Sequence, residues 1–371
     1  MRGRGFSDAP AALTGARRIL LVRLDNIGDV VLLSPAIAAI RQACPDAELT
    51  LLASPAGALA APLLPAIDHV IEHRASWQQL DPGGVEASTE RALIEQLRAE
   101  AFDAAIIFTS FSQTPVAAAY ACYLAGIPLR AAFNGDAFSG ELITHAVTSA
   151  EAPEHQAERA AFLVEELGLP LSDTRLRLAV PRAARAEADD ALSTVGVGPL
   201  ASYVAIVPGA SASARRYSAE RFAEVARDHA RRGEHVVVVG SARETSLVEE
   251  ITERAGDGVA GLAGRTSVPA LAALIQRARL VVANNSLALH LADAFGTPVV
   301  STYAGTDPAS YWGPRRAPHR LITAPADCAP CFRITCNRGH ECLDIPAHSV
   351  VAAGMELLEP VGAGSGEGTS E

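Results

Sequence analysis

The residues best suited to chemistry stand directly after short apolar runs of the sequence. Gly28 and Asp29 follow the run Ile19–Val22. A glycine lets the backbone approach a ligand closely, and an aspartate just beyond a strand could act as a general base toward an attacking hydroxyl. Asp29 could equally cap the helix that follows, which is the commoner role of such a residue. One aspartate can fill both roles, so the two interpretations are kept.

A second polar stretch, Asn284-Asn285-Ser286, stands between an apolar run and a helical pattern. Free N–H groups at a helix start, together with the helix dipole, form an anion site. A diphosphate would fit there. The alternative is a plain strand-to-helix turn with a Ser or Asn cap, and the stretch taken alone favours that turn.

Two further loops carry groups suited to a nucleotide. Small residues including Gly209 and Ser211 precede Arg215 and Arg216, so the loop permits close contact with phosphate, and the two guanidinium groups could neutralise it. The alternative is a solvated basic turn.

Glu244 lies one turn past another apolar run, Val236–Val239, where a carboxylate is well placed to accept hydrogen bonds from ribose hydroxyls. The same glutamate could simply be favoured by the dipole of the helix that follows. The sequence supports the two interpretations about evenly.

Four of the six cysteines crowd into one short segment as C-x2-C-x4-C-x5-C: Cys328, Cys331, Cys336 and Cys342. Four thiolates at this spacing suit tetrahedral zinc or iron, so the spacing favours a structural metal. The alternative is a set of reduced or partly paired cysteines that tie down a loop. Four thiolates leave no open position, which argues against a catalytic metal. The isolated Cys44 and Cys122 are expected to be buried packing residues.

These residues need a scaffold, and the 371-residue chain is long enough for two domains. Short apolar runs alternate with helical patterns along most of it, which predicts α/β architecture with parallel sheets covered on both faces. Ligands then sit beyond the carboxyl ends of the strands, in a cleft between two doubly wound domains. The predicted segments are a disordered arm over 1–17, domains over 18–194 and 195–347 with a hinge at Val195–Pro199, a helix over 348–360 and a disordered tail over 361–371.

Composition excludes several classes of protein. The net charge is −11, which argues against sequence-independent binding to nucleic acid and leaves at most peripheral contact with an anionic membrane. The apolar runs are too short to span a bilayer and residues 1–18 do not resemble a signal peptide, so a cytoplasmic location is expected. No G-x-S-x-G, Walker or H-E-x-x-H motif occurs, and the lack of G-x-G-x-x-G argues against a nicotinamide enzyme.

Taken together, these stretches resemble glycosyltransferase family 9, the heptosyltransferase family of lipopolysaccharide core assembly. The resemblance covers residues 18–358, and each piece is weak alone, but the pieces occur in order at sensible spacing. They are Ile19–Pro35, Val207–Tyr217, Leu262–Ser267, Asn285–Gly296 and Pro298–Pro314.

The resemblance implies a two-domain GT-B fold and an inverting transfer from ADP-heptose that needs no metal or other cofactor for catalysis. It places Asp29 on the family's proposed general base and Glu244 on its ribose contact. Ser286 and the backbone at Leu287 fall on its phosphate-cradling turn. Arg215 or Arg216 replaces the family's phosphate-binding lysine. The implied partners are a nucleotide-sugar donor and a glycan, lipid-linked or protein acceptor.

Two departures bear on the donor sugar. The family usually has Asp-Ser/Thr-Gly at 285–287, where this chain has Asn285-Ser286-Leu287. Asn carries no charge, and Leu287 removes the flexibility of glycine, so the donor could carry a different heptose or a hexose. In a related branch that glycosylates autotransporter proteins, a cysteine-bound iron is known. The alternatives are therefore a protein or natural-product transferase, a non-catalytic nucleotide-sugar-binding protein and a GT-B epimerase.

Overall fold

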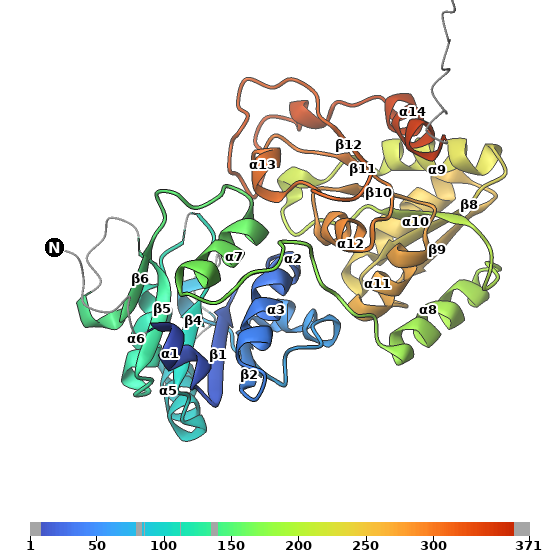
Figure 1. The fold of residues 1–371 in the computed structure, drawn as a ribbon. Coiled ribbons are helices and arrows are strands. Elements are labelled where there is room, and N and C mark those ends of the chain that lie inside the picture. Colours follow the sequence, from blue (N-terminus) through green and yellow to red (C-terminus); the bar gives the residue numbers. More distant parts are fainter. Residues whose placement is uncertain (1–8, 79–83, 85, 112, 135–139, 360–371) are drawn as a thin grey trace, which may run out of the picture. The chain divides into compact units, whose positions relative to one another are not determined.

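The structure is a computed structural model that describes residues 9–78, 84, 86–111, 113–134 and 140–359 (Figure 1). The chain forms two compact units. The first contains Met1–Arg182 and Ser310–Trp312, and the second contains Ala183–Ala309 and Gly313–Glu371. Within the described residues, no helix is long and apolar enough to cross a membrane.

The first unit is built on a six-stranded parallel sheet with the strand order β3-β2-β1-β4-β5-β6. The apolar run of β1 is almost fully buried, as a strand covered on both faces requires. Helices α3 and α7 pack together, as do α5 and α6. The strands are β1 Arg18–Arg23, β2 Glu48–Ala53, β3 His69–Glu72, β4 Ala104–Ile107, β5 Leu129–Asn134 and β6 His145–Thr148, and the helices are α1 Ala9–Thr14, α2 Ile27–Val31, α3 Ser34–Ala43, α4 Pro55–Ala58, α5 Ala87–Glu100, α6 Val116–Leu124 and α7 Gln156–Glu166.

The second unit repeats this topology with the order β12-β11-β10-β7-β8-β9. Helix α9 packs with α10 and α14, and α11 packs with α12. In both units the chain starts in the middle of the sheet and reverses direction between two central strands, β1 and β4 or β7 and β10. The strands are β7 Tyr203–Val207, β8 His235–Gly240, β9 Val259–Ala263, β10 Leu280–Asn284, β11 Val299–Thr302 and β12 His319–Ile322, and the helices are α8 Arg182–Thr194, α9 Ala219–Arg231, α10 Thr245–Ala255, α11 Val268–Arg277, α12 Leu287–Phe295 and α14 Ala347–Leu358. Helix α13, Ala309–Trp312, belongs to the first unit except for Ala309.

The prediction of two doubly wound parallel sheets is confirmed. The units divide after Arg182, however, and not at the expected boundary after residue 194. Helix α8 belongs to the second unit because its acidic side chains bind there: Glu187 accepts a hydrogen bond from the Ser267 amide, and Asp189 pairs with Arg277. The expected hinge at Val195–Pro199 consequently lies inside the second unit.

Residues 9–17 correct the expectation of a disordered arm, because they include helix α1. Leu13 on this helix is fully buried, and the Cys44 thiol donates a hydrogen bond to its carbonyl oxygen at 3.3 Å. The lack of a side chain at Gly168 leaves room for Pro10. Helix α1 is therefore part of the first core. Residues 1–8 of the predicted arm and the predicted tail over 361–371 lie outside the described residues.

Replacing Leu13 with alanine tests this packing. The variant loses buried contacts and leaves a cavity, so we expect the free energy of unfolding to fall by about 2–5 kcal/mol in urea denaturation. Leu200 is fully exposed, and Leu200→Ala serves as a control that should stay within about 0.5 kcal/mol of the unaltered chain. Equal stability of the two variants would show that α1 adds nothing to the core.

Candidate functional site

Asp29 lies in the first turn of α2, directly after the central strand β1. Asn26 is the N-cap of this short helix, and Asp29 completes a capping box with it. The Oδ2 atom of Asp29 accepts a hydrogen bond from the Asn26 amide at 3.1 Å. The capping role expected for this aspartate is therefore present. Gly28 lies in the same turn.

A buried arginine holds the other side of Asp29. Arg23 is the last residue of β1 and only 3% exposed. Its Nη2 donates to Asp29 Oδ1 at 3.1 Å and to Ser110 Oγ, beyond β4, at 2.8 Å. Its Nε lies 2.8 Å from Asp25 Oδ2. Arg23 thus joins the ends of β1 and β4, at the point where the strand order reverses and ligands bind in sheets of this type.

The two carboxylates that share Arg23 differ in their surroundings. Burial raises the pKa of Asp25, the charge of Arg23 opposes that rise, and the negative charge of Asp29 adds to it. Gln113 also donates to Asp25 Oδ1. Both oxygens of Asp29 are oriented by donors, but each keeps a further lone pair that could accept a proton. Sequence inspection missed Arg23 and Asp25, although charged residues at the end of an apolar run were the available signal.

In the second unit, Asn284 holds together the corresponding point of the sheet. This fully buried residue ends β10, and its Nδ2 donates to the carbonyl oxygen of Pro208, after β7, at 2.7 Å. Its Oδ1 accepts hydrogen bonds from the Tyr217 amide and from Thr302 Oγ1, both at 3.0 Å. The loop that follows β7 is therefore fixed across the ends of three neighbouring strands.

Gly209 and Glu244, which the sequence proposed separately, lie in contact. A Cβ atom at Gly209 would stand only 1.9 Å from Glu244 Oε1, so a larger residue there would have to displace the Glu244 carboxylate. The other oxygen, Oε2, accepts from the amide and the hydroxyl of Ser241 at 2.8 and 2.9 Å in a capping box. Glu244 therefore caps its helix and also presents Oε1 to the loop after β7.

The two arginines of this loop differ in their availability. Arg215 Nη2 forms an ion pair with Asp307 Oδ2 at 2.6 Å, and its Nε donates to Thr306. Arg216 is exposed and donates only its Nε, to the carbonyl oxygen of Ala210 at 3.0 Å. In the described part of the chain no carboxylate pairs with Arg216, so its terminal N–H groups are the freer pair. Ser211, in the same loop, is exposed.

Helix α12 begins at Leu287, three residues after Asn284. Ser286 is the N-cap in an extended conformation, without a side-chain hydrogen bond to the first turn. Leu287 is the first helical residue and is half-buried. Asn285 is buried, and its Oδ1 accepts from the Ala304 amide at 3.4 Å. The first-turn amides of α12 thus lack a side-chain cap, as an anion site at a helix start requires.

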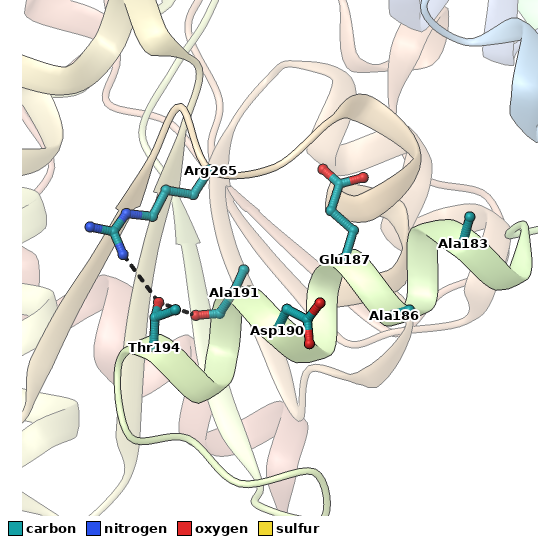
Figure 2. Close-up of a pocket in the computed structure, with 7 residues that line it drawn as sticks. All are labelled: Ala183, Ala186, Glu187, Asp190, Ala191, Thr194 and Arg265. Atoms are coloured by element: carbon teal, nitrogen blue, oxygen red, sulfur yellow. Dashed lines mark hydrogen bonds between the residues drawn. The ribbon is translucent and has the colours of Figure 1, made fainter.

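Two residues of the Leu262–Ser267 stretch form hydrogen bonds with α8. Figure 2 shows Arg265 donating to Thr194 Oγ1, at 3.1 Å, and the carboxylate of Glu187 turned toward the loop. Glu187 accepts from both the amide and the hydroxyl of Ser267. An open depression of about 540 Å³ lies along this face of the helix, and alanines form much of its lining. It is lined by Ala183, Ala186, Glu187, Asp190, Ala191, Thr194 and Arg265.

The four clustered cysteines form no disulfide. Burial raises the pKa of the Cys342 thiol, a hydrogen bond from the Gly305 backbone opposes the rise, and the other three thiols add to it. Cys336 Sγ accepts hydrogen bonds from the backbone amides of Arg338 and His340, both at 3.4 Å. Across the described ranges, however, no three or more His, Cys, Asp or Glu side chains are grouped so as to hold a metal ion. The predicted tetrathiolate is therefore not preformed.

Known proteins are similar to this chain in both sequence and fold. The sequence profile described as glycosyltransferase family 9 (heptosyltransferase) matches residues 90–341. Lipopolysaccharide heptosyltransferase 3 of Escherichia coli (strain K12) is 28% identical over 348 residues, which cover 89% of this chain and 95% of that protein. The structure of the family 9 glycosyl transferase from Veillonella parvula DSM 2008 superposes with a TM-score of 0.74 at 22% identity, covering 92% of this chain and 97% of that one.

A second solved structure, the ADP-heptose lps heptosyltransferase II of E. coli, superposes with a TM-score of 0.71 at 22% identity and covers 92% of this chain and 98% of its own. The profile match extends over more than half of the chain. The chain therefore belongs to glycosyltransferase family 9, the heptosyltransferase family, and is a glycosyltransferase.

Proposed function

We propose that this enzyme transfers a heptosyl group from ADP-heptose to a hydroxyl of a lipopolysaccharide core acceptor, with inversion at the anomeric carbon. The names of the similar E. coli proteins support the donor and the acceptor. The observation that carries the proposal is the anchored carboxylate of Asp29 at the reversal point of the first sheet. Donors on both oxygens fix its orientation, and its remaining lone pairs can take the acceptor proton.

In the proposed reaction, the acceptor hydroxyl gives its proton to Asp29 while its oxygen attacks the anomeric carbon of the donor. The bond from that carbon to the diphosphate oxygen breaks, and the electron pair leaves with ADP. Arg215, Arg216 and the first-turn amides of α12 stabilise the developing charge on the leaving group, as fixed dipoles and cations do in many transferases. No metal takes part in these steps.

The remaining predicted residues are assigned to the donor. Glu244 Oε1 is proposed to accept hydrogen bonds from the ribose hydroxyls, and Gly209 and Ser211 to let the nucleotide approach the loop after β7. Asn285 replaces a carboxylate near the donor sugar, and Leu287 replaces a glycine at the start of α12. Both are proposed to tune the choice of sugar more than the grip on the diphosphate. A lipid-linked acceptor would bring the enzyme into no more than peripheral contact with a membrane.

Asp29→Asn tests the general base, since the amide keeps the shape and cannot take a proton. We expect kcat to fall by about 10²–10⁴-fold, while the Kd for ADP measured by calorimetry stays nearly unchanged. Asp25→Asn is the matched control, because Asp25 shares Arg23 but lies on its other side. It should retain most activity. Comparable losses in both variants would mean that Asp29 acts only through the charge balance around Arg23.

The departures at Asn285 and Leu287 favour the alternative of a non-catalytic nucleotide-sugar-binding protein. An assay of the unaltered chain with ADP-heptose distinguishes this alternative from an enzyme. An active transferase should hydrolyse ADP-heptose slowly without acceptor. If ADP-heptose binds and neither transfer nor hydrolysis occurs, the non-catalytic alternative is the correct one.

Gly209→Ala tests the arrangement of the ribose site. The added Cβ would displace the end of the Glu244 side chain, so we expect ADP affinity to fall about tenfold or more, equivalent to about 1.4 kcal/mol. The melting temperature should change little, because the displaced group is the tip of a flexible side chain. Gly198→Ala is the control, since a Cβ there meets nothing within 4 Å. Unchanged ADP affinity in Gly209→Ala would place the nucleotide elsewhere.

The hypothesis of a structural zinc or iron at Cys328, Cys331, Cys336 and Cys342 is independent of the reaction, and it requires the thiols to converge. If it is correct, about one metal ion per chain should copurify. Cys336→Ser should then release the metal, whereas Cys44→Ser, at a cysteine buried in the first unit, should retain it. Elemental analysis that finds neither metal in the unaltered chain would refute the hypothesis.

A further inference from the structure

Arg159 is a buried cation that the mechanism above does not use. It lies on α7 in the first unit and is 9% exposed. Its guanidinium carbon lies 4.3 Å from the ring centroid of Phe133 and 4.8 Å from that of Phe111. Its Nε is buried without a hydrogen-bond acceptor, and no carboxylate of the described residues forms an ion pair with it.

The position of Arg159 relates it to the proposed catalytic carboxylate. Phe133 is near the end of β5 and Phe111 follows β4; β4 lies beside β1, and β5 lies on the other side of β4. Arg159 contacts the ring of Phe111, and the preceding residue, Ser110, accepts a hydrogen bond from Arg23, which also binds Asp29. Arg159 therefore lies at the same carboxyl edge of the sheet as Arg23 and Asp29. Burial lowers the pKa of Arg159, and the positive charge of Arg23 lowers it further.

A structural role explains this arrangement poorly. Arginine remains protonated in proteins, and a buried charge without a partner is unfavourable. The two phenylalanine rings compensate in part, through the attraction between a cation and a ring face. Ring contacts of this kind occupy the face of the guanidinium and leave its in-plane N–H groups free. Those groups have the geometry to bind a carboxylate or a phosphate through two parallel hydrogen bonds.

We propose that Arg159 binds an anionic group of the acceptor, a carboxylate or a phosphate, and so directs a neighbouring acceptor hydroxyl toward Asp29. The inference rests on the proposed function, in which the first unit holds the acceptor and the second unit carries the groups assigned to ADP. The enzyme then selects acidic acceptors, because a neutral analogue leaves the buried charge of Arg159 without a partner.

The first measurement needs no acceptor. Arg159→Met keeps most of the side-chain volume against the rings and removes the unpaired charge, so the melting temperature should be unchanged or higher. Arg91→Met, at an exposed arginine of α5, is the control for removal of a charge from the first unit. A clearly lower melting temperature for Arg159→Met than for Arg91→Met would show that Arg159 serves stability, and the proposal would be wrong.

The second measurement is anion binding, followed by thermal shift with excess ADP present to fill the proposed donor site. The probes are glucuronate, glucose 6-phosphate and neutral glucose at equal ionic strength. We expect at least one acidic sugar to stabilise the unaltered chain and Arg91→Met, and to bind Arg159→Met about tenfold or more weakly. The sugar that responds identifies the anion as a carboxylate or a phosphate.

Two results would overturn the proposal: equal stabilisation by glucose, or full retention of the acidic-sugar response in Arg159→Met. If the unaltered chain fails to bind ADP, the proposed function is contradicted. The same titrations still show whether the acidic sugars bind and whether their binding requires Arg159. Where an acceptor is turned over, Arg159→Met should raise its KM and leave slow hydrolysis of ADP-heptose unchanged, because hydrolysis uses no acceptor anion.

Discussion

The first site depends on the way a single buried guanidinium is neutralised. Arg23 ends the central strand of the sheet, in a position where an unpaired charge would be strongly unfavourable. Asp25 and Asp29 both form ion pairs with Arg23, and Ser110 accepts a further hydrogen bond from it. The backbone after β1 must therefore turn so that both carboxylates reach the same arginine. That turn starts α2 and orients Asp29 as helix cap, as ion-pair partner of Arg23 and as the proposed base.

In the second unit, an uncharged side chain, that of Asn284, holds the corresponding strand ends together. Asn284 joins the ends of β10 and β7, as Arg23 joins the ends of β1 and β4. Both residues lie where the strand order reverses, which is the place where doubly wound sheets bind ligands. The amide of Asn284 adds no charge, so the positive charge beside the loop after β7 comes from Arg215 and Arg216. A charged anchor in one unit and a neutral anchor in the other suit a proton acceptor and a phosphate site respectively.

Sequence patterns predicted the elements that carry the sheets, because strands buried on both faces are continuous apolar runs. The apolar runs Ile19–Val22 and Val236–Val239 lie inside β1 and β8. Helix α1 was missed, since six residues are too few for a periodic pattern to be distinguished. The contacts that build the sites were not visible for a different reason: Arg23 and Ser110 are 87 positions apart, and Asn284 and Pro208 are 76 apart. The cysteine spacing indicated a metal, but spacing alone does not ensure that the thiols converge.

If Asp29 is the base and Arg159 binds the acceptor anion, as proposed, the charges at the end of β1 link acceptor binding to proton transfer. Four buried groups are involved: Arg23 and Arg159 carry positive charge, and Asp25 and Asp29 carry negative charge when ionised. In the proposed reaction Asp29 takes the acceptor proton, so one negative charge disappears from a region of low dielectric constant and the cluster becomes more positive. An acceptor anion on Arg159 restores the balance at that moment. Before the proton moves, ionised Asp29 repels this anion and weakens its binding. After the proton has moved, Asp29 is neutral and the repulsion is gone. Its binding would then strengthen along the reaction, which is the kind of interaction that accelerates a chemical step.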